Sequence, residues 1–129
     1  MPMAGRFKPG PCLLAALFLA ILSAPLSASP DQQPYRILIS NDDGFKAPGI
    51  QALFNRLKSL GEVTVAAPAT NQSLVGHGFT FGKAIDVESW ETEGGRWFAI
   101  AATPATCVRM ALTSLLPQLP DVVVSGINK

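Results

Sequence analysis

A short apolar run, residues 37–39, leads directly into the polar sequence Asn41-Asp42-Asp43-Gly44. The run has the length and composition of a buried strand, and Gly44 permits a sharp turn after it. Two adjacent carboxylates are therefore expected just beyond the carboxyl end of a strand, where open α/β sheets bind ligands. Because like charges repel, the pair favours a divalent cation with oxygen ligands. The alternative is a solvated turn, since Asn, Asp and Gly are common turn residues.

The residues that follow predict a strand–helix–strand unit. Apolar residues recur at helical spacing over residues 48–60, with Pro48 in the first turn and Gly61 as the expected stop. Residues 62–67 are rich in β-branched side chains and predict a second strand. This spacing predicts two parallel strands joined by a right-handed crossover, and hence an α/β fold with a mainly parallel sheet.

The next segment predicts a β-hairpin. Residues 85–87 and 97–101 are expected to form its two strands, around a turn at residues 93–95. Such a hairpin would be an excursion from the parallel sheet.

The last segment predicts a second helix and a last strand. Thr103 and Pro104 are expected to open the helix as its N-cap and first residue, and Pro117 to end it. Residues 121–126 predict a strand that is apolar enough to be buried on both faces.

Three polar clusters follow the three strands that are expected to be parallel, namely residues 41–43, residues 71–73 and Asn128. Because parallel strands end at the same edge of a sheet, these clusters should converge there. Carboxylate, hydroxyl and amide oxygens, together with water, make an all-oxygen site that suits Mg²⁺, Mn²⁺ or Ca²⁺ rather than zinc.

The first 28 residues have the three parts of a secretory signal peptide. Arg6 and Lys8 supply a basic start, residues 13–22 are continuously apolar, and small residues precede a cleavage expected after Ala28. The apolar run is shorter than the ~20 residues that a spanning helix needs, although an uncleaved anchor is the alternative. Residues 29–35 are expected to be a linker before a single domain at 36–129.

Charge and cysteine content limit the partners and crosslinks of this domain. The formal net charge of +1 gives no field that would attract a nucleic acid polymer or an anionic membrane. Once the signal peptide leaves with Cys12, Cys107 is the single cysteine, so an intrachain disulfide is not expected. Export would place the protein in the periplasm or outside the cell.

Four motifs in this order resemble the survival protein SurE family. They are residues 37–44 with 47–50, residues 67–68 with 71–73, residues 103–104 with 107–108, and residues 120–128. The resemblance runs from Arg36 to the last residue. Members of this family are metal-dependent 5′/3′-nucleotidases that act on nucleoside monophosphates, with an acid-phosphatase-like chemistry.

The resemblance implies a Rossmann-like three-layer sandwich and a divalent cation, Mg²⁺ or Mn²⁺, held by Asp42, Asp43, Ser73 and Asn128. The ion would neutralise phosphate charge and lower the pKa of a bound water that attacks phosphorus. Asp42 and Asp43 are the implied catalytic residues, and either one could orient that water or accept its proton. The family also implies a homodimer or tetramer.

The chain departs from the family pattern at two places. The family usually has Asp at the position of Thr106, where an acid would complete a capping box, so we expect an effect on helix stability rather than on chemistry. Family members also continue beyond the equivalent of Asn128 with further sheet and helix, whereas Lys129 is the last residue here. The chain is therefore expected to be a C-terminally truncated member, incomplete at its C-terminus.

Several alternatives stay open at this point. The chain could be a non-catalytic fragment that binds metal or nucleotide without turnover, and it could be cytoplasmic, as most of the family is. A phosphate-accepting receiver domain also begins with an acidic pair, but it needs an acid after a central strand, and residues 121–124 run into Ser125 and Gly126 instead. His77 is interpreted as a loop residue rather than a catalyst. Trp90 and Trp97 are expected to pack at the hairpin, with stacking on a nucleobase as the alternative.

Overall fold

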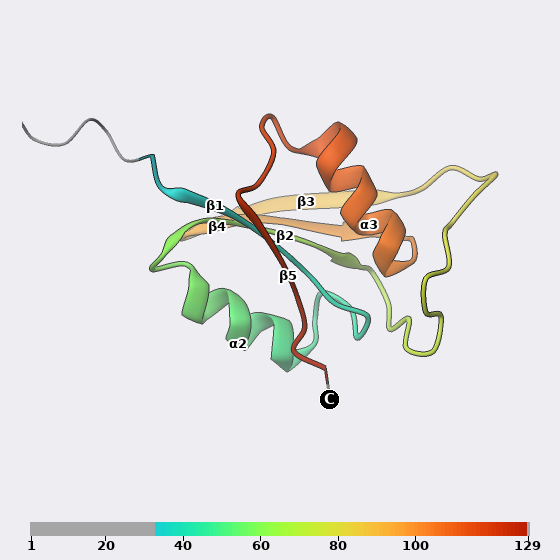
Figure 1. The fold of residues 1–129 in the computed structure, drawn as a ribbon. Coiled ribbons are helices and arrows are strands. Elements are labelled where there is room, and N and C mark those ends of the chain that lie inside the picture. Colours follow the sequence, from blue (N-terminus) through green and yellow to red (C-terminus); the bar gives the residue numbers. More distant parts are fainter. Residues whose placement is uncertain (1–32, 129) are drawn as a thin grey trace, which may run out of the picture. The chain divides into compact units, whose positions relative to one another are not determined.

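The computed structural model describes residues 33–128. The predicted signal peptide at residues 1–28 lies outside this described part. Five strands form one sheet in the order β3-β4-β2-β1-β5 (Figure 1). They are β1 (Tyr35–Ser40), β2 (Gly61–Pro68), β3 (Val87–Thr92), β4 (Gly95–Ile100) and β5 (Val122–Ser125). All pairings are parallel except that of β3 with β4, so the predicted mainly parallel α/β fold is confirmed.

Helices cover both faces of the sheet (Figure 1). Helix α2 (Pro48–Leu57) packs on one face through Ile50 and Phe54. Helix α3 (Pro104–Met110), extended by the π-helical turn η1 (Ala111–Leu115), packs on the other. Successive residues of β1 serve the two layers, because side chains of a strand alternate between its faces. Ile37 and Ile39 lie in the α2 core, whereas Leu38 lies in the α3 core. No helix among residues 33–128 has the length and apolar character needed to span a membrane.

The hairpin is built into the sheet. Strand β4 pairs with β2 in parallel from Val63↔Gly95 to Pro68↔Ile100, so only β3 runs against the common direction. The expected strand at residues 85–87 is wrong in position, because β3 begins at Val87 and continues to Thr92. Its sequence is mostly polar, as an edge strand permits, and an apolar strand signal is therefore missing from it.

Helix α2 ends at Leu57, earlier than the predicted Leu60, which is 62% exposed. Gly61 was expected to stop the helix, but it is the first residue of β2. A Cβ atom at Gly61 would lie 2.0 Å from the carbonyl oxygen of Tyr35 on β1. The glycine therefore serves the close approach of two strands rather than the helix end.

Strand β5 is an exposed edge strand. The expectation that it is buried on both faces is wrong, since Val122 and Val123 are 44% and 45% exposed. Within the described residues only β1 pairs with β5, so one side of the strand has no neighbour in the sheet. The carboxyl group of Asp121 fastens the start of this strand to β1 through the backbone N–H and the guanidinium of Arg36, at 2.8 and 3.0 Å. These hydrogen bonds hold the pKa of Asp121 below its usual range.

Cys107 lies fully buried in the core between α3 and the sheet. Burial raises the pKa of this thiol to about 12. Because the thiolate is the reactive form, we expect Cys107 in a Cys12→Ser variant to resist a disulfide reagent at about pH 8. Full reaction after unfolding in guanidinium is the control, and rapid labelling of the folded protein would contradict the buried position.

Candidate functional site

The turn after β1 is braced by its own asparagine. Asn41 is buried, its Nδ2 donates to the carbonyl oxygen of Gly44 at 3.1 Å, and its Oδ1 accepts from the Gly44 N–H at 3.2 Å. Gly44 has φ of +96°, a conformation that side-chain-bearing residues rarely adopt. Asp42 and Asp43 are half-buried between these two residues. The sequence therefore builds a tight turn that presents two carboxylates at the end of the strand.

The loop after β2 is tied to this turn. The backbone N–H of Gln72 donates to the carbonyl oxygen of Asp42 at 2.7 Å. Nδ2 of Asn71 donates to Oδ1 of Asp43 at 3.4 Å, and Oδ1 of the same Asn71 accepts from the backbone N–H of Ser73 at 2.8 Å. Asn71 thus links the second carboxylate to the serine that was predicted as a ligand.

The third polar cluster reaches the same edge of the sheet. A cavity of about 580 Å³ is lined by Asn41 and Asp42 after β1, Gln72 after β2, and Ser125 and Asn128 at and after β5. The predicted convergence of the strand ends is therefore confirmed by the parallel topology and this shared lining. Asp43 and Ser73 do not line the cavity and are joined to it through the hydrogen bonds of the 71–73 loop.

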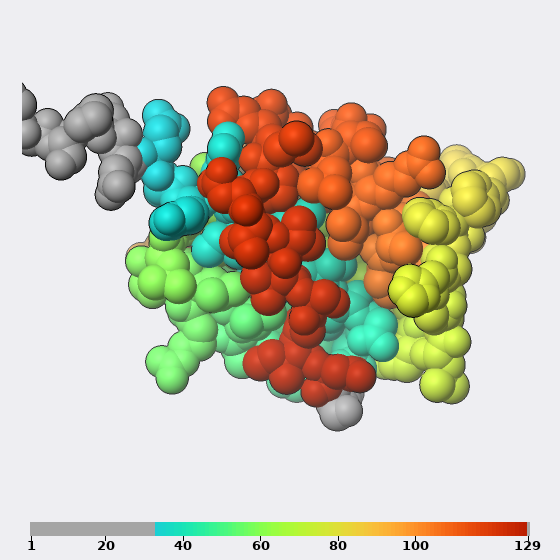
Figure 2. Space-filling model, viewed as in Figure 1, coloured from blue at the N-terminus to red at the C-terminus, as the bar shows by residue number. Residues whose placement is uncertain are grey.

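The segment that carries Asn128 passes close to the first turn of α2. A Cβ atom at Gly49 would lie 2.4 Å from the carbonyl oxygen of Ile127, so the glycine permits this approach. The N–H of Gly126 also donates to the carbonyl oxygen of Ser40 at 3.0 Å. Figure 2 shows the last described residues, in dark red, on the surface of the molecule, and Asn128 is exposed there.

One carboxylate oxygen of the turn fits a cation. Oδ2 of Asp43 is buried and has no hydrogen-bond partner among residues 33–128. A buried charge without compensation is costly, so a cation against this oxygen would relieve the cost. The described part of the chain holds no cluster of three or more His, Cys, Asp or Glu side chains that could bind a metal. A cation here would therefore need the neutral oxygens of serine and asparagine as well, a donor set that suits Mg²⁺ or Mn²⁺.

Three threonines that the sequence did not single out as a group join the loop before β3 to the start of α3. Oγ1 of Thr106 accepts from the backbone N–H of Thr80 at 2.9 Å and lies 3.0 Å from Oγ1 of Thr103. Oγ1 of Thr80 accepts from the backbone N–H of Thr103 at 3.1 Å. Thr103 is at the predicted N-cap position, but its side chain does not cap the helix. Thr106 therefore supplies an oxygen acceptor at the position where the resemblance led us to expect Asp.

The remaining predicted candidates, His77, Trp90 and Trp97, do not line the cavity at the strand ends. His77 is exposed on the loop between β2 and β3, in agreement with its interpretation as a loop residue. Trp90 and Trp97 pack on each other across the hairpin, with ring centroids 6.1 Å apart. Asn41 and Asn71 have structural roles that the sequence analysis did not assign. Their only sequence signal was membership in the polar clusters after β1 and β2.

The fold and the residues at its edge define a class. This is a Rossmann-like α/β protein that presents carboxylate and amide groups at the carboxyl ends of parallel strands. A family model described as survival protein SurE matches residues 37–129, and the chain belongs to this family. The resemblance seen in the sequence is thereby confirmed.

Proteins similar to this chain are named SurE. The chain is 50% identical over 92 residues to the 5′-nucleotidase SurE of Pelobacter propionicus, covering 71% of this chain and 36% of that relative. It is 48% identical over 93 residues to the 5′-nucleotidase SurE of Methanopyrus kandleri, with coverages of 72% and 36%. The crystal structure of the SurE protein from Aquifex aeolicus matches with a TM-score of 0.59 and 41% identity, over 72% of this chain and 37% of that one. The chain thus spans little more than a third of the length of the curated relatives it matches.

Proposed function

We propose that this chain provides the acidic site of a metal-dependent phosphomonoesterase that acts on nucleoside monophosphates, a 5′/3′-nucleotidase. The observation that carries the proposal is the buried Oδ2 of Asp43, which has no hydrogen-bond partner among residues 33–128 and lies in a turn where three strand ends meet. Relatives at about half identity are named 5′-nucleotidase, which supports the same substrate class here.

Asp42, Asp43, Ser73 and Asn128 are the residues that would hold Mg²⁺ or Mn²⁺. When bound, such an ion supplies neutralisation of phosphate charge and a bound water of lowered pKa. Asp42 or Asp43 would orient the attacking water or accept its proton. Asn41 keeps both carboxylates in place by closing the turn through Gly44, and Asn71 holds Asp43 against the neighbouring loop.

Release of inorganic phosphate from nucleoside monophosphates by the purified chain is the direct test. We expect turnover with Mn²⁺ or Mg²⁺ that a chelator abolishes and added metal restores. A folded chain that binds metal or nucleotide without releasing phosphate would favour the non-catalytic alternative. Turnover that is insensitive to the chelator would contradict the assigned metal dependence.

Export and assembly belong to the same proposal. The sequence of residues 1–28 supports a secretory signal, and a reporter fused after Ala28 should appear outside the cytoplasm. A reporter that stays in the cytoplasm would contradict export. We propose a homodimer or tetramer as the assembled form, to be checked by light scattering. No nucleic acid polymer is proposed as a partner.

A further inference from the structure

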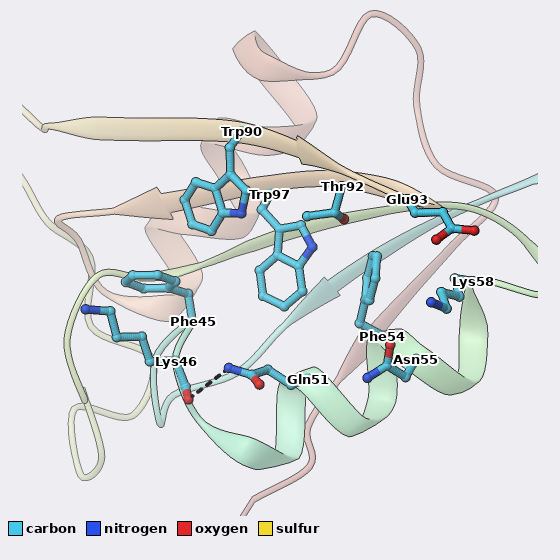
Figure 3. Close-up of a pocket in the computed structure, with 10 residues that line it drawn as sticks. All are labelled: Phe45, Lys46, Gln51, Phe54, Asn55, Lys58, Trp90, Thr92, Glu93 and Trp97. Carbon is cyan, nitrogen blue, oxygen red and sulfur yellow. Dashed lines mark hydrogen bonds between the residues drawn. The ribbon is translucent and has the colours of Figure 1, made fainter.

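A second cavity lies between α2 and the β3–β4 hairpin (Figure 3). Its volume is about 410 Å³, within the range of about 300–1,000 Å³ that is usual for small-molecule sites. Four aromatic rings line it, from Phe45, Phe54, Trp90 and Trp97. The acidic turn, residues 41–44, does not line this cavity. The names of the similar proteins assign no ligand to it.

The aromatic rings form a fixed apolar wall. The ring planes of Trp90 and Trp97 are nearly parallel, with an angle of 16° between them. Phe45 meets Trp90 edge-on at 5.4 Å between centroids, and Phe54 meets Trp97 at 5.0 Å. Trp97 is buried and Trp90 is half-buried. Aromatic rings held in this way can stack on any nucleobase, because every base has a π-face.

The indole N–H of Trp97 is a buried hydrogen-bond donor. Its Nε1 atom is buried and makes no hydrogen bond within the described part of the chain, although buried tryptophan N–H groups usually find a partner. Figure 3 shows this nitrogen on the side of the ring that faces Phe54 and Thr92, both of which line the cavity. A ligand with an acceptor atom in its ring plane would satisfy this donor.

Polar side chains complete the cavity. Gln51 and Asn55 of α2 offer amide groups, and Nε2 of Gln51 is held by the carbonyl oxygen of Lys46 at 3.2 Å (Figure 3). The Lys46 ammonium lies 5.3 Å from the centroid of the Phe45 ring, and both residues lie at the same end of the cavity in Figure 3. Lys58 and Glu93 of opposite charge line the other end. The aromatic rings and the amide groups suit a planar heterocycle, and the Lys46 ammonium suits an anionic group attached to it.

One residue of the cavity lining lies close in sequence to the candidate metal site. Only Gly44 separates Phe45 from Asp43, and the backbone N–H of Phe45 donates to the carbonyl oxygen of Pro68 at 3.0 Å. The turn therefore crosses the end of β2 on its way to the aromatic wall. We propose that this cavity binds the base of the nucleoside monophosphate, an inference that rests on the proposed function. Lys46 would lie on the phosphate side of the bound nucleotide.

The two tryptophans of the chain both line the cavity, so selectively excited tryptophan fluorescence reports on it. The full chain is titrated in chelator with adenosine 5′-monophosphate, adenosine and ribose 5-phosphate. We expect a saturable change with the nucleotide and the nucleoside, and no change with the sugar phosphate. An equal change with ribose 5-phosphate, or none with the nucleotide, would overturn the proposal.

Two variants sharpen this test. Trp90→Leu keeps Trp97 as the reporter and should weaken nucleotide binding about tenfold or more, because stacking on an aromatic ring contributes this much per base. Phe81→Leu, an exposed aromatic outside the cavity lining, is the matched control and should bind as the wild type does. Should circular dichroism show that Trp90→Leu is unfolded, Lys46→Ala decides instead: it should weaken binding of the nucleotide and spare that of adenosine. Unchanged nucleotide binding in the folded variant would overturn the proposal.

Different results would contradict the proposed base site and the proposed nucleotidase activity. A fluorescence change with the nucleotide but no phosphate release would support the base site and reject the nucleotidase. Chelator-sensitive phosphate release with equal kcat/KM for adenosine 5′-monophosphate and ribose 5-phosphate would keep the enzyme and reject the base site.

Discussion

Replacing Asp43 by asparagine is expected to lower kcat/KM for nucleoside monophosphates by about 100- to 1,000-fold, because a metal's Lewis-acid stabilisation is worth several kcal/mol and each 1.36 kcal/mol is tenfold in rate. The amide keeps the shape of the carboxylate and its contact with Asn71. It loses the negative charge at Oδ2, an atom with no hydrogen-bond partner in the described part of the chain, on which metal binding depends in our proposal. Phosphate release and a Mn²⁺ titration measure the two consequences separately.

The same variant should be at least as stable as the wild type in chelator. Without metal, the wild-type turn holds a buried carboxylate oxygen that has no partner among residues 33–128, and an uncharged amide removes that cost. Thermal melts with and without Mn²⁺ test this expectation. In chelator the Tm of the variant should be no lower than that of the wild type, whereas metal should raise the Tm of the wild type far more than that of the variant.

Asp86→Asn is the matched control for Asp43→Asn. Asp86 is exposed on the loop before β3, where its backbone carbonyl oxygen accepts from the N–H of Ala101 at 2.9 Å. Asp86 is not among the residues proposed to hold the metal and does not line the cavity at the strand ends. The substitution therefore removes the same charge outside the proposed site, and activity, metal affinity and metal-dependent Tm should all stay unchanged. Wild-type activity in Asp43→Asn, or an equal loss in both variants, would remove Asp43 from the metal site.

Strands β1 and β2 and helix α2 were predictable because each has a local signal of its own. The apolar run at residues 37–39 and the β-branched run at 62–67 are short and bounded by turn residues, and α2 has its apolar stripe. The meeting of strand ends was predictable too, since it needs only that the strands be parallel.

The features that were missed depend on contacts between distant residues. Strand β3 carries few apolar residues because it lies at an edge, and the exposure of β5 follows from its single neighbour in the described sheet. Gly61 is part of β2 and pairs with Tyr35, so it does not act as the helix stop that its sequence position suggested. Similarly, the brace made by Asn41 and the link made by Asn71 are side-chain hydrogen bonds that no spacing rule reveals.

Replacing Gly44 by alanine is expected to cost about 1–2 kcal/mol of stability from the left-handed backbone alone, since φ is +96° there. A packing cost adds to it, because a Cβ atom would lie 3.2 Å from the backbone carbon of Thr70 and 3.3 Å from the carbonyl oxygen of Pro68. The loop must therefore move away from the turn, and Asn71 with it. Because Asn71 holds Asp43, metal affinity should fall about 10- to 100-fold, as it does when residues supporting metal ligands are lost. Urea unfolding in chelator measures the loss of stability, and a Mn²⁺ titration measures the loss of metal affinity.

Gly82→Ala separates the two contributions. Gly82 has a similar left-handed φ of +69°, but a Cβ atom there would meet nothing within 4 Å. This variant should lose stability through its backbone alone and keep the metal affinity of the wild type. If Gly44→Ala bound Mn²⁺ as tightly as Gly82→Ala does, the close packing of the turn against residues 68–71 would not be what positions Asp43. A loss of affinity confined to Gly44→Ala would show that the glycine is required because it lets the two loops touch.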